Sequence, residues 1–116
     1  MEVFNFEKAT GDTALVGTTS AYDSVVMRPI MVQGKRTGVF QVLTVETDGG
    51  TYDTANKIEL KGSLTGGAND YSVILTITDQ AEDTASHNVV TLMPYMKVAV
   101  SGDNTAGITF TCSLGI

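Results

Sequence analysis

The chain has 116 residues, 42% of them hydrophobic and only 17% charged, and its formal net charge is −6. This length suits one domain and excludes two. The single cysteine excludes an internal disulfide and a cysteine-based zinc site, and 7 Lys and Arg against 13 Asp and Glu argue against binding to nucleic acid or to an anionic membrane.

The N-terminal segment predicts a short extended piece of chain. Residues 1–12 are either an arm that adds a strand to a neighbouring subunit or the first edge strand of the chain's own sheet, and residues 13–116 form a single β-sandwich domain. The segment has no basic head and no long apolar run, so we expect no secretory signal and synthesis in the cytoplasm. Its candidate partner contacts are three apolar residues: Val3, Phe4 and Phe6.

Two more apolar runs follow, Ser24 to Val32 and Gly38 to Thr47, and each predicts a strand. In the second run apolar residues occupy both faces, because successive side chains of a strand point to opposite sides. We expect the core to cover one face and something else to cover the other, and we add Phe40 to the candidate partner contacts. The two faces carry Val39, Leu43 and Val45 on one side and Phe40 and Val42 on the other.

Alternation with a period of two continues through the second half of the chain. Between these runs, Gln80 to Ser86 predicts either one helical turn or a polar loop. The Gly102–Gly107 turn joins the last two runs, so Tyr95 to Leu114 predicts an antiparallel hairpin. The alternating runs are Lys57–Lys61, Ser72–Thr78, Met96–Val100 and Ile108–Leu114.

These runs and turns predict an all-β fold, an antiparallel two-sheet β-sandwich of immunoglobulin-like or jelly-roll type with about seven to eight strands. The alternation also predicts which side chains face the core. These are Val42, Ile58, Leu60, Val73, Leu75, Ile77, Met96, Val98, Val100, Ile108, Phe110 and Cys112.

The sequence offers little for catalysis or metal binding. Asp79 to Asp83 is the nearest approach to a calcium loop, but it lacks the order of an EF-hand, and solvated loop carboxylates are the simpler interpretation. His87 has no second His or Cys at ligand spacing, and no Gly-x-Ser-x-Gly elbow is present. Cys112 alternates with polar residues as a small buried hydrophobe does. We therefore predict no catalytic residue, no metal ligand, no cofactor and no enzymatic activity.

Surface character points to attachment. The outward strand positions are rich in Thr and Ser, and such faces pack against protein without the desolvation cost of Lys and Glu. Sugar-binding β-sandwiches stack sugar rings on exposed aromatic residues, and this chain has no Trp and 4 Tyr. A carbohydrate-binding module therefore stays open as an alternative, with Tyr22, Tyr52, Tyr71 and Tyr95 as its scattered aromatic residues.

Three stretches resemble small β-sandwich virion proteins of tailed bacteriophages. Lys57 to Tyr71 contains a strand, Gly62-Ser63, a loop and a Tyr, and Pro94 to Gly102 matches the pattern Tyr-x-Arg/Lys-Val-x-Val-Ser-Gly. Gly107 to Thr111 completes the likeness, which covers about the last half of the chain and transfers no functional residue. Cement or decoration proteins of phage heads are the group it resembles most.

This resemblance implies a structural protein on the outer surface of a phage capsid. It would bind across subunits of the major capsid protein and stabilise the mature head, without contacting nucleic acid or membrane. It also implies a homo-oligomer, a trimer before a dimer. The alternatives are a tail, neck or fibre component of the virion and a carbohydrate- or host-surface-binding module.

Overall fold

A computed structural model describes residues 2–7, 13, 23–25, 37–46, 56–81, 83–102 and 108–116. These residues form eight strands and contain no helix, hence none that could span a membrane. The strands are β1 (Val3–Asn5), β2 (Asp23–Val25), β3 (Thr37–Glu46), β4 (Asn56–Ser63), β5 (Ser72–Thr78), β6 (Thr84–Thr91), β7 (Tyr95–Gly102) and β8 (Ile108–Gly115).

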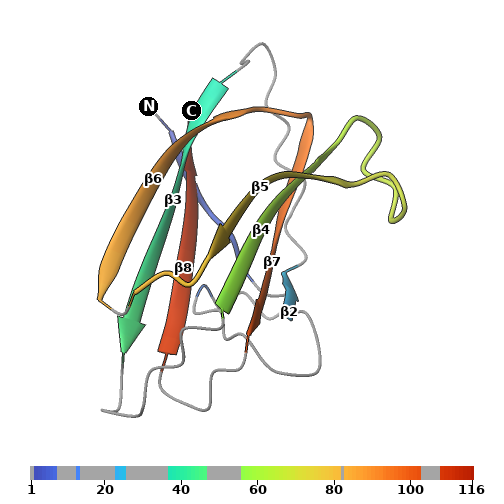
Figure 1. The fold of residues 1–116 in the computed structure, drawn as a ribbon. Helices are drawn as coiled ribbons and strands as arrows, with labels where there is room; N and C mark the ends of the chain where they lie inside the picture. The colour runs from blue at the N-terminus through green and yellow to red at the C-terminus, as the bar shows by residue number, and fades with distance from the viewer. Residues whose placement is uncertain are drawn as a thin grey trace.

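The strands form two four-stranded sheets that pack face to face (Figure 1). One sheet has the order β1-β8-β3-β6 and the other the order β2-β7-β4-β5, and every pairing in both is antiparallel. The chain is therefore a two-sheet antiparallel β-sandwich, as the period-two pattern predicted.

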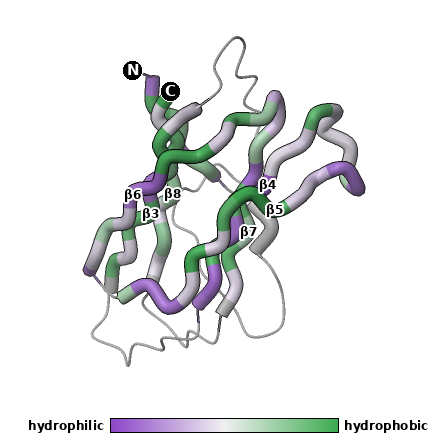
Figure 2. The backbone as a smooth tube through the Cα atoms, turned by 45° about the horizontal axis from the view of Figure 1, so that its top comes forward, coloured by the Kyte–Doolittle hydropathy of each residue, from purple (hydrophilic) through white to green (hydrophobic). Residues whose placement is uncertain are grey.

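The core lies between the sheets and is built from the inward-facing residues of both. The rings of Phe6 and Phe40 meet edge to face, with centroids 5.9 Å apart and planes at 83°. Figure 2 shows hydrophobic residues along β8, β3 and β5 and a hydrophilic stretch in the loop between β4 and β5. Eight of the residues predicted to face the core are fully buried: Val42, Ile58, Leu60, Met96, Val98, Val100, Phe110 and Cys112.

The prediction is wrong for Val73 on β5, whose side chain is 47% exposed. The register between β4 and β5 shifts at Leu60 and Lys61, so that Leu75 and Val73 oppose them and Ile74 is the extra residue. A bulge of this kind changes which residues face the core, and Ile74 packs against the core with Leu75 and Ile77. The side chain of Ile108 lies outside the described residues.

The predicted hairpin from Tyr95 to Leu114 is also wrong. β7 pairs with β4 and β2, whereas β8 pairs with β3 and β1, so these consecutive strands lie in opposite sheets. One-sided alternation only requires that each apolar face meets the core, and two strands satisfy it equally as neighbours in one sheet or as opposite layers.

The segment from Gln80 to Ser86 connects the two sheets and contains no helical turn among its described residues. Thr84 to Ser86 already belong to β6, a strand that the apolar pattern did not predict. Asp79 and Asp83 adopt left-handed backbone conformations, with φ of 54° and 51°. Asp tolerates this region better than most residues, which allows the chain to turn sharply as it passes from β5 to β6.

Candidate functional site: the outer face of the β1-β8-β3-β6 sheet

The outward side of the β1-β8-β3-β6 sheet carries no charged residue among its described side chains. Phe40, Val42 and Thr44 of β3 are buried toward the core, so the alternate residues of β3 and their registered partners face outward. We call this surface the outer face. It comprises Val3, Asn5, Thr37, Val39, Gln41, Leu43, Val45, Ala85, His87, Val89, Thr91, Thr109, Thr111, Ser113 and Gly115.

The other sheet is different on its outward side. β4 places Lys57, Glu59 and Lys61 there, and β7 adds Lys97. The Lys57 ammonium lies 3.7 Å from the Glu59 carboxylate. The two outward surfaces of the sandwich thus differ in charge, and covering the described side chains of the outer face removes no Lys, Arg, Asp or Glu from water.

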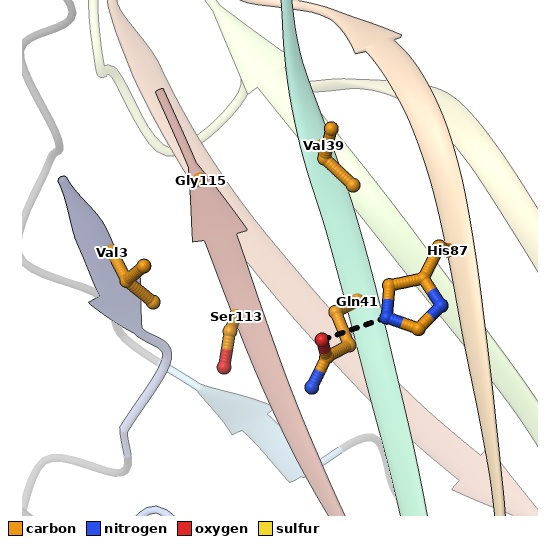
Figure 3. A pocket seen from close by; sticks show the side chains of 6 residues that line it. All are labelled: Val3, Val39, Gln41, His87, Ser113 and Gly115. Carbon is orange, nitrogen blue, oxygen red and sulfur yellow. Dashed lines mark hydrogen bonds between the residues drawn. The ribbon is translucent and has the colours of Figure 1, made fainter. Parts of the chain in front are cut away.

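A row of four polar side chains crosses the middle of the outer face. Register places Asn5 beside Ser113, Ser113 beside Gln41 and Gln41 beside His87. The Ser113 hydroxyl donates to Asn5 Oδ1 at 2.7 Å. His87 Nε2 lies 2.9 Å from Gln41 Oε1, the interaction that Figure 3 marks with a dashed line. These bonds fix the orientations of the row, because each pair spans two strands.

A hollow of about 200 Å³ opens beside this row. Gly115 lies between Val3 and Val39 in the next row of the sheet, and its missing side chain leaves the space that the two valines flank (Figure 3). Val3 is 63% exposed. The hollow suits an apolar side chain from another protein, with polar atoms at one wall. Its lining is Val3, Val39, Gln41, His87, Ser113 and Gly115.

The four residues predicted to contact a partner do not share one surface. Val3 lies on the outer face, and Phe4 is half-buried against the core. Phe6 and Phe40 are fully buried, so in this conformation their rings belong to the core and neither is exposed to a partner. Phe40 points to the same side of β3 as the buried Val42, whereas Gln41 between them points to the outer face.

The N-terminal segment is an edge strand of the chain's own sheet. β1 pairs with the end of β8, and backbone bonds extend the pairing on both sides. Glu2 N donates to Ile116 O at 2.8 Å, Ile116 N donates to Glu2 O at 2.9 Å, and Phe6 N donates to Cys112 O at 2.9 Å. For the described residues 2–7 the structure shows an edge strand of the chain's own sheet, which brings Val3 to the outer face.

The candidate chemical residues are placed apart. His87 faces an amide and not a carboxylate, and no cluster of three or more His, Cys, Asp or Glu within the described ranges could hold a metal ion. Asp79 and Asp83 serve as turn residues. Burial raises the pKa of the Cys112 thiol to about 12, so it stays protonated at neutral pH and is a poor nucleophile.

One constellation escaped the sequence analysis. Tyr71, the residue before β5, lies beneath Lys97 of β7, whose ammonium is 4.1 Å from the ring centroid. Burial raises the pKa of Tyr71, and the nearby Tyr95 adds to the rise. The signal was present as Tyr95-x-Lys97, two residues on one strand face, but only the sheet order brings Tyr71 to them. Tyr22 and Tyr52 lie outside the described residues.

Comparison with protein-family models, with curated proteins and with solved structures gave no match for this chain. The candidate site is therefore assigned from its own geometry: an uncharged sheet face with exposed valines, a central polar row and one hollow.

Proposed function

We propose that this protein is a non-enzymatic attachment module that binds other protein through its outer face. The observation that carries the proposal is the absence of charge from the described side chains of a face that spans four strands, in a chain whose net charge is −6. A soluble acidic protein keeps such a face where it meets another surface, because charged residues are depleted at the centres of protein interfaces.

The energetics of the outer face suit docking. Val3 and Val89 are 63% and 77% exposed, and fully burying a side chain of this size contributes about 1.5–3 kcal/mol. The polar row costs less to cover than unpaired polar groups would, because Ser113 bonds to Asn5 and Gln41 bonds to His87. A partner side chain in the hollow would add shape specificity.

The setting that we propose is a phage virion, with the protein as a capsid cement or decoration protein. Support comes from the resemblance of residues 57–71, 94–102 and 107–111, which fall on the β4–β5 hairpin, β7 and the start of β8. In that setting the partner is the major capsid protein at the outer surface of the head. Binding only to the mature subunit arrangement stabilises it by mass action.

Two other functions fit parts of the molecule. A tail, neck or fibre component would use the same outer face on a different virion partner. A carbohydrate- or host-surface-binding module would instead use Tyr71 and Tyr95, which approach each other beside Lys97. One face of the Tyr71 ring is already covered by the Lys97 ammonium, which leaves less of it for stacking, and we therefore favour attachment to protein.

The proposal is tested by the protein's abundance and mode of attachment on purified particles. Quantitative mass spectrometry should find copies comparable in number with the capsid subunits; a few copies per particle would indicate the tail, and none would overturn the virion assignment. Val3→Asp should weaken rebinding to particles stripped of the protein by at least about tenfold, or about 1.4 kcal/mol. Val73→Asp, on the opposite sheet, is the matched control and should bind normally.

A further inference from the structure

The proposed attachment through the outer face does not use the free edge of β6. β6 pairs with β3 over eight consecutive positions without a register shift, and no strand within the described ranges bonds to its other side. Figure 1 shows β6 at the outermost position of its sheet. Its sequence, Thr84 to Thr91, contains no Asp, Glu, Lys, Arg or Pro.

An edge of this kind is a template for pairing with another strand. Proteins usually protect long edges with charged residues, proline, bulges or very short strands. The other described edges have such protection, because β1 and β2 span three residues each and β5 carries the register shift at Ile74. β6 has none of these, and it carries Val89, which is 77% exposed.

The symmetry of an antiparallel edge and the absence of charge on β6 favour a second copy of this chain as the occupant. Two molecules of net charge −6 repel one another over most approaches. Approach through β6 brings together two uncharged strands and, behind them, two uncharged outer faces. An antiparallel strand can also pair with itself across a twofold axis, so that the same patch serves both molecules.

We propose that two copies of this protein pair antiparallel through β6 and join their four-stranded sheets into one continuous sheet of eight strands. Directly opposite residues in an antiparallel pair point to the same face of the sheet. The twofold axis that relates the two copies must therefore pass beside one residue of β6, which then lies opposite itself, and not between two successive residues. Placing it at Asn88 sets the two amides opposite each other, and an amide is both donor and acceptor. The exposed Val89 then lies opposite His87 of the second copy.

This pairing goes beyond attachment, since it concerns the protein alone. It closes at two molecules and therefore favours a dimer over the trimer that the resemblance implied. It would also place two outer faces side by side on one rigid sheet, so that a pair of weak attachments could act together.

The first test measures the mass of the purified protein in solution by size exclusion with light scattering, without any partner. The wild type should be a concentration-dependent dimer. Val89→Lys should raise the dimer dissociation constant at least tenfold, because lysine on an edge strand is one of the devices that prevent strand pairing. Val73→Lys, the same substitution on the β5 edge, should leave it unchanged. A monomeric or trimeric wild type, or equal effects of both variants, would overturn the pairing.

The second test locates the axis by cross-linking. Opposite Cα atoms in an antiparallel pair lie about 4.5–5.5 Å apart, within the range of disulfides. Asn88→Cys should therefore form a disulfide-linked dimer on mild oxidation, while the buried Cys112 does not compete. Thr76→Cys, at an exposed position of β5, is the control. Cross-linking of Asn88→Cys that is no faster than that of the control would contradict the proposal. Because neither test includes a particle, failure here leaves the attachment proposal standing on its own experiment.

Discussion

Asn56 and Gln80 hold each other by a reciprocal pair of hydrogen bonds. Asn56 Nδ2 donates to the Gln80 carbonyl at 3.2 Å, and the Gln80 N–H donates to Asn56 Oδ1 at 3.1 Å. Asn56 begins β4 in one sheet, while the Gln80 side chain reaches the other sheet, donating to Val42 O at 2.9 Å and accepting from the Ser86 hydroxyl at 2.9 Å. Gln80 thus ties the two layers together at the crossover that leads into β6.

Replacing Gln80 should destabilise the sandwich. Gln80→Ala removes the side-chain bonds to Val42 and Ser86 and leaves a buried carbonyl without that donor, at about 1–3 kcal/mol for such a group. We expect the free energy of unfolding, measured by urea denaturation, to fall by about 2–3 kcal/mol. Ser86→Ala, which removes only the hydroxyl bond, should cost about 1 kcal/mol. Equal losses for the two variants would contradict the bridging role of Gln80.

Replacing the hydroxyl of Thr44, in contrast, should stabilise the sandwich. Its side chain is buried toward the core, and its hydroxyl has no hydrogen-bond partner in the part of the chain that the structure describes. Thr44→Val replaces the hydroxyl with a methyl group of similar size, so the unfolding free energy should rise by about 1 kcal/mol. Thr44→Ser keeps the hydroxyl, loses a methyl group and should be destabilised. A marked loss of stability in the valine variant would show that the hydroxyl is bonded.

Two adjacent glycines in the β4–β5 loop should respond differently to alanine. Gly66 has φ of +77°, and a Cβ there would meet the Tyr95 ring at 2.9 Å, so Gly66→Ala should cost about 1–3 kcal/mol. At Gly67 the close atom is Asp70 Oδ2, the end of a side chain that can move, and the cost should be smaller. The free energy of unfolding of each variant is measured by thermal unfolding, with the unfolding enthalpy determined for that variant. A larger loss for Gly67→Ala than for Gly66→Ala would contradict this loop geometry.

The pH dependence of stability should show the burial of Cys112. Its pKa is raised by burial from an ordinary 9.0 to about 12, so the folded state favours the neutral thiol. The contribution is fully present below about pH 9 and is lost as the pH rises toward 12. Tyr71, whose pKa is also raised, adds a loss of the same sign.

Cys112→Ala isolates the thiol. The variant should lose less stability between pH 9 and pH 12 than the wild type. Below pH 9 residue 112 should add no pH dependence to the stability of either protein. In parallel, a thiol reagent should react with the wild-type protein only as fast as it unfolds. Rapid labelling under native conditions would show that Cys112 is accessible.

The sequence predicted which side chains face the core better than it predicted which strands are neighbours in a sheet. Val98 and Phe110 each lie in a run whose large apolar residues occupy every second position, which is enough to predict that both face a core. Their strands, however, lie in opposite sheets and not side by side in one sheet. β6 was not predicted because Thr84 to Asn88 contains no large apolar residue on either face, as an exposed edge strand can. The prediction that Val73 faces the core was wrong because a bulge changes the face to which this residue points. The alternation of apolar residues in the sequence does not indicate where such an extra residue lies.

The candidate site was predictable only in its chemistry. Outward threonines and a low charged fraction indicated an attachment surface, yet Phe40 was assigned to it although it shares its face with Val42. The hollow depends on Gly115 lying between Val3 and Val39, three residues from distant parts of the chain. Such a row is set by register, which the turn and bulge geometry of the whole sheet determines.

Solvent-accessibility footprinting of the protein, free and bound to purified particles, tests the attachment surface most directly. The account predicts that binding protects Val3, Val39 and Leu43 of the outer face while Lys57, Lys61 and Lys97 on the opposite sheet keep their reactivity. Protection of the three lysines with the outer face left exposed would contradict it.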